Sequence, residues 1–168
     1  RQVTRVATVH AINSARAVPA NVEAEAALLG ALLIDNRIFE QISTIVSNMD
    51  FHEPVHARIY AAIVRHLEAG RTVTPILLKP EFEDDEALKE LGGPAYLAQL
   101  TADGQGLLAP VELAEQIRDL ALQRALIEAG RGLAEAAFDT SEETRPADIL
   151  ARHKDALEAA TARSQASL

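Results

Sequence analysis

The sequence PVELAEQIRDLALQRALIEAGRGLAEAAF, residues 110–138, is the longest stretch of the chain without a strong helix breaker. Its proline suits the first position of a helix, and its apolar residues recur every three or four positions. A polar stretch at 139–145 follows, and a second apolar stripe runs from Ile149 to Ala160. Two long helices joined by a short turn form an antiparallel helical hairpin, which we predict over residues 110–163.

The residues before the hairpin carry the start and stop signals of several shorter helices. Asn21 is a favourable N-cap for the first of them. Pro54 suits the first position of a longer one, and Gly70 suits its end. Spaced apolar residues and turn residues predict three further short helices, near 38–46, 84–91 and 94–101.

These patterns predict an all-α chain in which a compact head of short helices precedes the long antiparallel hairpin. We place the head at residues 19–102 and expect Pro80 to interrupt the apolar stretch before it. Residues 1–18 show no regular apolar period and are expected to form a flexible arm. Residues 164–168 are small and polar, which is typical of the start of a linker.

Composition excludes several classes of function. The 168 residues include no cysteine, which excludes a disulfide scaffold, a thiol nucleophile and Cys-ligated zinc. No apolar run is long enough to span a membrane. The net charge is −9. Residues 1–20 contain three arginines and no acidic residue, so the remainder of the chain carries a still more negative net charge. A body this acidic repels phosphate backbones, so we expect little direct binding to DNA.

The segment His52-Glu53-Pro54-Val55-His56 matches the H-E-x-x-H pattern of zinc proteases. In those enzymes the motif lies within one helix, which projects both histidines from one face. Pro54 instead favours a helix that begins after Glu53, and this removes the required geometry. A metal hydrolase built on His52, Glu53 and His56 is the alternative from a different class of function. The simpler reading is that His56 packs in the helix while Glu53 assists its start.

The remaining residues give no constellation for catalysis, and we expect this stretch not to be an enzyme. Gly130-Arg131-Gly132 lacks the Lys-Ser/Thr of a phosphate-binding loop. Glycine inside a long helix costs about 1 kcal/mol relative to alanine, so a close helix–helix approach should offset it. We therefore predict self-association through the hairpin, with a contact formed by Leu126, Ala129, Gly130, Gly132 and Leu133.

Several short motifs, in their order and spacing, resemble the N-terminal domain of bacterial replicative DNA helicases, the DnaB family. The resemblance covers about residues 19–160. The sequence departs from the family after Gly70, where Thr72–Pro75 and Pro80 intervene, and in the loop at 103–106. The matching elements are Val22–Glu25, Leu29–Leu33, Asp50-Phe51, His56, Ile59-Tyr60, Leu91–Gly93 and Tyr96-Leu97.

The resemblance implies a non-catalytic, cytoplasmic collar that pairs through its hairpin and builds a hexamer. ATP and magnesium would belong to a motor domain whose Walker motifs this stretch lacks, so no cofactor is expected here. The family's partners are primase and the helicase loader. The candidate contacts for primase are Glu23, Arg124 and Ile127. Arg124 and Ile127 lie three apart and share a helix face. The alternative within the same process is the helicase-binding helical domain of a primase.

Overall fold

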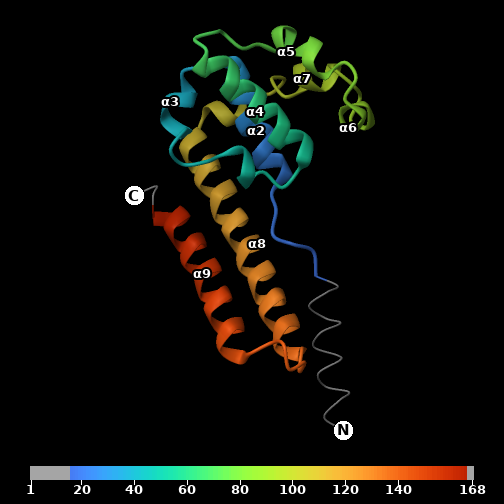
Figure 1. Cartoon of the computed structure of the whole chain (residues 1–168). Helices are drawn as coiled ribbons and strands as arrows, with labels where there is room; N and C mark the ends of the chain where they lie inside the picture. The colour runs from blue at the N-terminus through green and yellow to red at the C-terminus, as the bar shows by residue number, and fades with distance from the viewer. Residues whose placement is uncertain (1–15, 166–168) are drawn as a thin grey trace.

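The computed structural model describes residues 16–165, and helix is the only regular secondary structure among them. Figure 1 shows the predicted architecture, a head of short helices followed by a long antiparallel hairpin, and the all-α class is confirmed. The elements in chain order are α2 (Val22–Ile34), α3 (Ile38–Ile42), η1 (Asn48–Asp50), α4 (Pro54–Glu68), α5 (Pro75–Phe82), α6 (Glu86–Glu90), α7 (Ala95–Gln99), η2 (Gln105–Leu107), α8 (Pro110–Phe138) and α9 (Pro146–Gln165).

The start and stop signals act as predicted at the two main helices of the head. The Asn21 side chain caps α2 by accepting a hydrogen bond from the backbone N–H of Ala24 at 3.0 Å. Pro54 is the first residue of α4, and Gly70 follows the helix with φ of 73°, which suits glycine.

Two local predictions for the head are wrong. The helix predicted near 38–46 ends at Ile42 and is followed by a turn, in which the N–H groups of Ile45 and Val46 both donate to the Ile42 carbonyl. The interruption expected at Pro80 does not occur, and α5 runs through it. Leu78 and Phe82, four residues apart on this helix, are both buried in the core. Their burial offsets the roughly 3 kcal/mol that an interior proline costs a helix.

The core of the head is built around α2, which contacts α4, η2 and α8. Leu28, Leu29 and Leu32 of α2 are fully buried. Ala114 and Ile117, in the first turns of α8, are buried against the head as well. The core therefore continues from the head into the first of the hairpin helices.

Glycine allows two parts of the chain to cross α2 closely. A β-carbon at Gly30 would lie 1.8 Å from the Leu100 carbonyl oxygen, at the end of α7. A β-carbon at Gly106 in η2 would lie 2.0 Å from the Ala27 carbonyl oxygen. The small residues at these crossings bring the 100–107 segment into backbone contact with α2.

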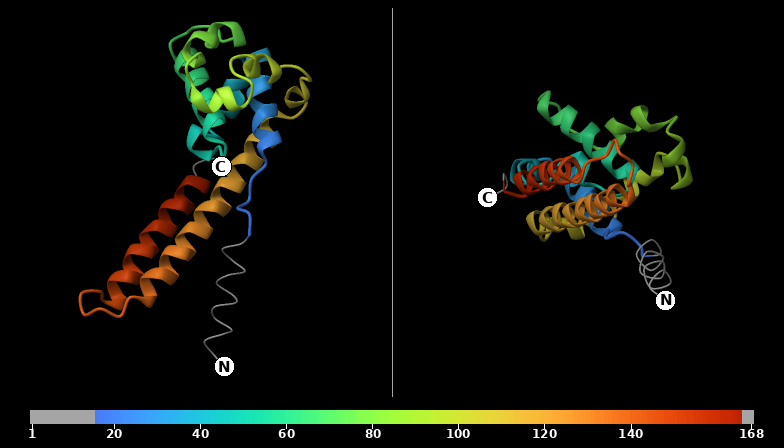
Figure 2. Two further views of the ribbon diagram at one scale, coloured as in Figure 1. Left: turned by 90° about the vertical axis from the view of Figure 1, so that its right-hand side faces the viewer. Right: turned by 60° about the horizontal axis from the view of Figure 1, so that its bottom comes forward.

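The hairpin projects from the head as two packed antiparallel helices (Figures 1 and 2). The Asp139 side chain orders their connection by accepting hydrogen bonds from the Ser141 backbone N–H at 3.0 Å and the Thr144 hydroxyl at 2.8 Å. Helix α9 continues to Gln165, whereas residues 166–168 and most of the predicted arm, residues 1–15, lie outside the described part of the chain. Among the described helices, none is long and apolar enough to cross a membrane.

Candidate functional site

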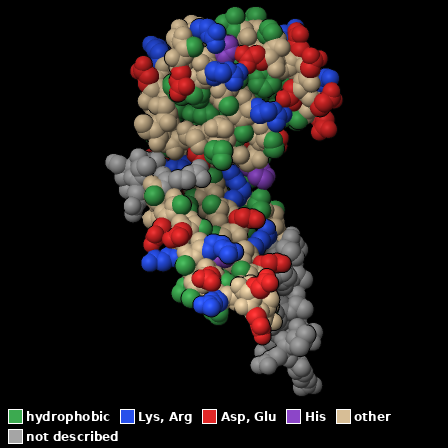
Figure 3. Space-filling model, in the orientation of Figure 1, with side chains coloured by type: hydrophobic (Ala, Val, Ile, Leu, Met, Phe, Trp, Pro, Cys, Tyr) green, Lys and Arg blue, Asp and Glu red, His purple; other side chains and the backbone are tan. Residues whose placement is uncertain are grey.

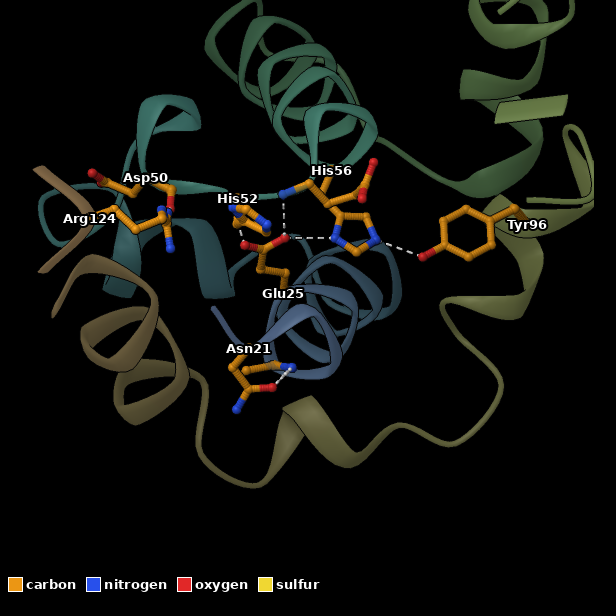
Figure 4. A network of polar contacts seen from close by, with 9 residues as sticks. Asn21, Glu25, Asp50, His52, His56, Tyr96 and Arg124 are labelled. Carbon is orange, nitrogen blue, oxygen red and sulfur yellow. Dashed lines mark hydrogen bonds and ion pairs between the residues drawn. The ribbon is translucent and has the colours of Figure 1, made fainter. Parts of the chain in front are cut away.

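A buried carboxylate, Glu25, joins the start of α4 to α2 (Figure 4). Its side chain is 2% exposed. The Glu25 Oε1 atom accepts a hydrogen bond from the His52 N–H at 2.5 Å, and Oε2 accepts one from the Glu53 N–H at 3.2 Å. These donors lie just before α4, so Glu25 satisfies backbone groups that the helix itself leaves without partners.

His56 extends this network to a third helix. Its Nδ1 atom lies 2.9 Å from Glu25 Oε2, and its Nε2 atom lies 2.6 Å from the Tyr96 hydroxyl of α7. The imidazole is fully buried, and both of its nitrogens are engaged. A single chain of polar contacts therefore ties α2, α4 and α7 together within the head.

The network shifts the pKa values of Glu25 and Tyr96, the two side chains that bond to His56. Burial alone would raise the pKa of Glu25, but the hydrogen bond with His56 and those from the two backbone N–H groups outweigh it and lower that pKa. Burial raises the pKa of the Tyr96 hydroxyl, and the nearby Glu53 and Glu25 carboxylates raise it further. Glu25 is thus held as an anion beside the histidine.

These contacts show what the H-E-x-x-H match does here. His52 and Glu53 lie outside α4, and His56 offers neither ring nitrogen to a metal ion. No group of three His, Asp or Glu side chains within the described residues is arranged to hold one. Glu53 is the N-cap residue of α4 but its side chain makes no cap hydrogen bond, and the carboxylate that accepts from the backbone N–H groups at this helix start belongs to Glu25.

The second candidate surface is one face of the hairpin, which carries large apolar side chains in solvent. Leu126 and Leu133 of α8 are 47% and 38% exposed. Leu150 and Leu157 of α9 are 68% and 42% exposed. Each pair is seven residues apart, which places its two members on one side of their helix.

Helix handedness brings both pairs to the same face of the hairpin. Gly132 marks the side of α8 that faces α9, since a β-carbon there would lie 3.4 Å from His153 Nε2. Leu133 comes one residue after Gly132 along α8, and Leu157 comes four residues after His153 along α9. Each leucine is therefore rotated about its own helix axis in the same sense from the line along which the two helices touch. In antiparallel helices such rotations point to one side of the pair. We call this set, Leu126, Leu133, Leu150 and Leu157, the leucine face.

The residues predicted for self-association divide between this face and the interior of the hairpin. Leu126 and Leu133 belong to the leucine face, and Gly130 is exposed with open space around it. Ala129 is half-buried. Gly132 lies against His153 of the same chain. Figure 3 shows one side of the hairpin, on which acidic, basic and hydrophobic side chains are mixed.

The three candidate primase contacts lie in different settings. Glu23 is exposed in the first turn of α2, and Ile127 is half-buried on α8. Arg124 extends to the head, where it donates hydrogen bonds to the backbone carbonyls of Pro19 at 2.8 Å and Asp50 at 2.7 Å. The role of these residues toward a partner stays a prediction.

Comparison with known proteins gives a consistent result. Residues 17–119 match the family model described as the DnaB-like helicase N terminal domain. The chain is 38% identical to the replicative DNA helicase DnaB of Rickettsia conorii, over 76% of this chain and 26% of that protein. It is 31% identical to the protein of the same name from Geobacillus stearothermophilus, over 77% of this chain and 29% of that protein. The chain thus spans between a quarter and a third of the length of these relatives.

A solved structure supports the fold. The chain resembles the crystal structure of the N-terminal domain of DnaB helicase from Mycobacterium tuberculosis with a TM-score of 0.73. The match covers 84% of this chain and 99% of the other, at 22% sequence identity.

Proposed function

Because this chain belongs to the family of DnaB-like helicase N-terminal domains, we propose that it is the non-catalytic collar of a replicative DNA helicase. In this role it joins helicase subunits into a ring and receives primase, while ATP and magnesium are used by a separate motor domain. The observation that supports subunit joining is the leucine face, which the chain's own fold leaves in solvent.

The leucine face has the character of a protein–protein contact. Exposed apolar side chains that gather on one side of a rigid element mark surfaces that are covered by a partner. A second copy of the chain offers the same face, so a two-fold dimer buries all of these leucines at once. Gly130, with no neighbouring atom within 4 Å of a β-carbon position, permits the partner helix to approach closely.

A matched pair of double variants tests this assembly by sedimentation equilibrium. Leu126→Gln with Leu133→Gln removes two apolar side chains from the leucine face, and we expect at least a tenfold weaker dimer. Glu128→Gln with Glu135→Gln introduces the same residues at the same spacing on exposed positions outside the leucine face. We expect the control to dimerise as the unchanged chain does. Equal effects of both variants, or no self-association of the unchanged chain at high micromolar concentration, would refute the assembly.

Primase docking is proposed on the outer face of the hairpin around Ile127, which is half-buried, and at the edge of the head around Glu23, which is exposed. An apolar side chain beside charged ones is the composition found at the centre and rim of protein interfaces. Ile127→Ala is expected to weaken binding of the primase helicase-binding domain by about tenfold, which corresponds to about 1.4 kcal/mol. Titration calorimetry measures this, with Glu128→Ala, one residue along α8, as the control. Unchanged affinity for the Ile127 variant would place the primase elsewhere.

A further inference from the structure

Arg124 is the residue through which the middle of α8 reaches the head. Its guanidinium donates hydrogen bonds to two backbone carbonyls that are far apart in the sequence, those of Pro19 and Asp50. Pro19 lies just before α2, and Asp50 lies in the segment that leads into α4. One side chain therefore holds α8 to the entry points of both main helices of the head, as Figure 4 shows for Asp50.

Helix α8 also contacts α2, α3, η1 and η2 of the head. The last buried apolar residue of α8 is Ile117, about two turns before Arg124. A further hydrogen bond, between the Asn21 and Gln116 side chains, lies at the same level as Ile117 and is exposed. Arg124 lies about two turns beyond Ile117, so its hydrogen bonds resist rotation of the hairpin at a longer lever arm than the packing of Ile117 does.

We propose that Arg124 is a latch that sets the angle between the head and the hairpin. With both hydrogen bonds formed, the two parts hold one orientation. With the bonds released, the hairpin changes its angle while the head and the hairpin each stay folded. Both hydrogen bonds are part-buried and Asp50 is 6% exposed, so the released form must open enough for water to reach the two carbonyls.

The latch also predicts how a partner would act on it. Backbone carbonyls are neutral acceptors, whereas a carboxylate forms stronger, charge-assisted hydrogen bonds with arginine. A protein partner that presents an acidic side chain at this position would therefore bind the released form more tightly and shift the population toward it. Docking on the hairpin would then be transmitted to the head, and this holds whether or not the partner is a primase.

Distance measurements by pulsed electron resonance between two spin labels test the latch directly. The chain has no native cysteine, so Glu68→Cys on the head and Ala151→Cys on α9, both exposed positions, accept the labels specifically. An excess of unlabelled chain suppresses signals between subunits. Arg124→Met removes both hydrogen bonds and keeps the aliphatic part of the side chain, and Arg118→Met is the control on the same helix. Within the described residues, the Arg118 guanidinium donates hydrogen bonds to the adjacent Asp119 at 3.1 and 3.2 Å, and to no group of the head.

The expected result is one narrow distance distribution for the unchanged chain and for Arg118→Met, and at least a doubling of its width, or a shifted mean, for Arg124→Met. Circular dichroism should show the same helix content in all three. A distribution that stays narrow in Arg124→Met would overturn the proposal. Global unfolding of both Arg124→Met and the milder Arg124→Lys would overturn it too, because the bonds would then maintain the fold rather than an angle.

Discussion

Gly30→Ala places a methyl group where α2 meets the backbone of the segment after α7. The new β-carbon would lie 1.8 Å from the Leu100 carbonyl oxygen, whereas ordinary contacts begin near 3.4 Å. The neighbour is backbone, so it cannot avoid the methyl group by a change of rotamer. The two segments must separate by more than an ångström.

The expected loss of stability follows from two opposing effects. Overpacking of a filled core costs about 1–3 kcal/mol, and a displacement of backbone belongs at the upper end of that range. Alanine is favoured over glycine inside a helix by about 1 kcal/mol, which offsets part of the cost. The net destabilisation is about 2 kcal/mol. For a chain of this length, that lowers the melting temperature by about 4–8 °C.

Gly130→Ala is the matched control, because it makes the same substitution inside a helix at an exposed position with no atom within 4 Å. Only the helix preference remains there, so this variant should gain up to about 1 kcal/mol. Calorimetric melting of both variants at low protein concentration measures the difference in sign. A Gly30→Ala variant as stable as the unchanged chain would refute the close crossing of α2.

The buried network gives the remaining predictions. Glu25→Gln keeps the side-chain shape but removes the anion that three donors share, and we expect a loss of about 2–4 kcal/mol in urea unfolding at pH 7. Because the folded pKa of Glu25 is lowered from 4.5, its contribution is present above that pH and is lost as the pH falls through the folded pKa. The stability difference between the unchanged chain and Glu25→Gln should therefore shrink on acidification, and growth of that difference would contradict the sign. Tyr96→Phe removes the hydroxyl that bonds His56 and should cost about 1–2 kcal/mol in the same assay, with no effect expected from Gln99→Ala, an exposed position on the same helix.

Local signals in the sequence predicted much of the fold. The Asn21 cap, Pro54 at a helix start and the long apolar stripes each act within a few residues, so they can be recognised without knowing the tertiary structure. The prediction at Pro80 was wrong because the burial of Leu78 and Phe82 in a core formed by distant parts of the chain outweighed the local tendency of proline to break a helix.

The polar contacts were harder to predict because their partners are far apart in the chain. Glu25 and His56 are separated by 31 residues, although a charged residue four before Leu29 on a buried stripe is a signal that some partner is required. Arg124 binds carbonyl oxygens of the main chain, which every residue possesses and no sequence pattern marks. The exposed leucines were recognisable as apolar, but their position on one face required the handedness of the hairpin.

The contribution of Ala114 and Ile117 to the core of the head determines the order in which the chain can fold during synthesis. Roughly 80 residues separate the end of α2 from Ile117, and ribosomes add about 5–20 residues per second. The leucines of α2 therefore lack part of their cover for on the order of 4–16 seconds after they are made. Throughout that interval they are available to chaperones and to other nascent chains, and the head becomes a complete folding unit only when the first turns of α8 emerge.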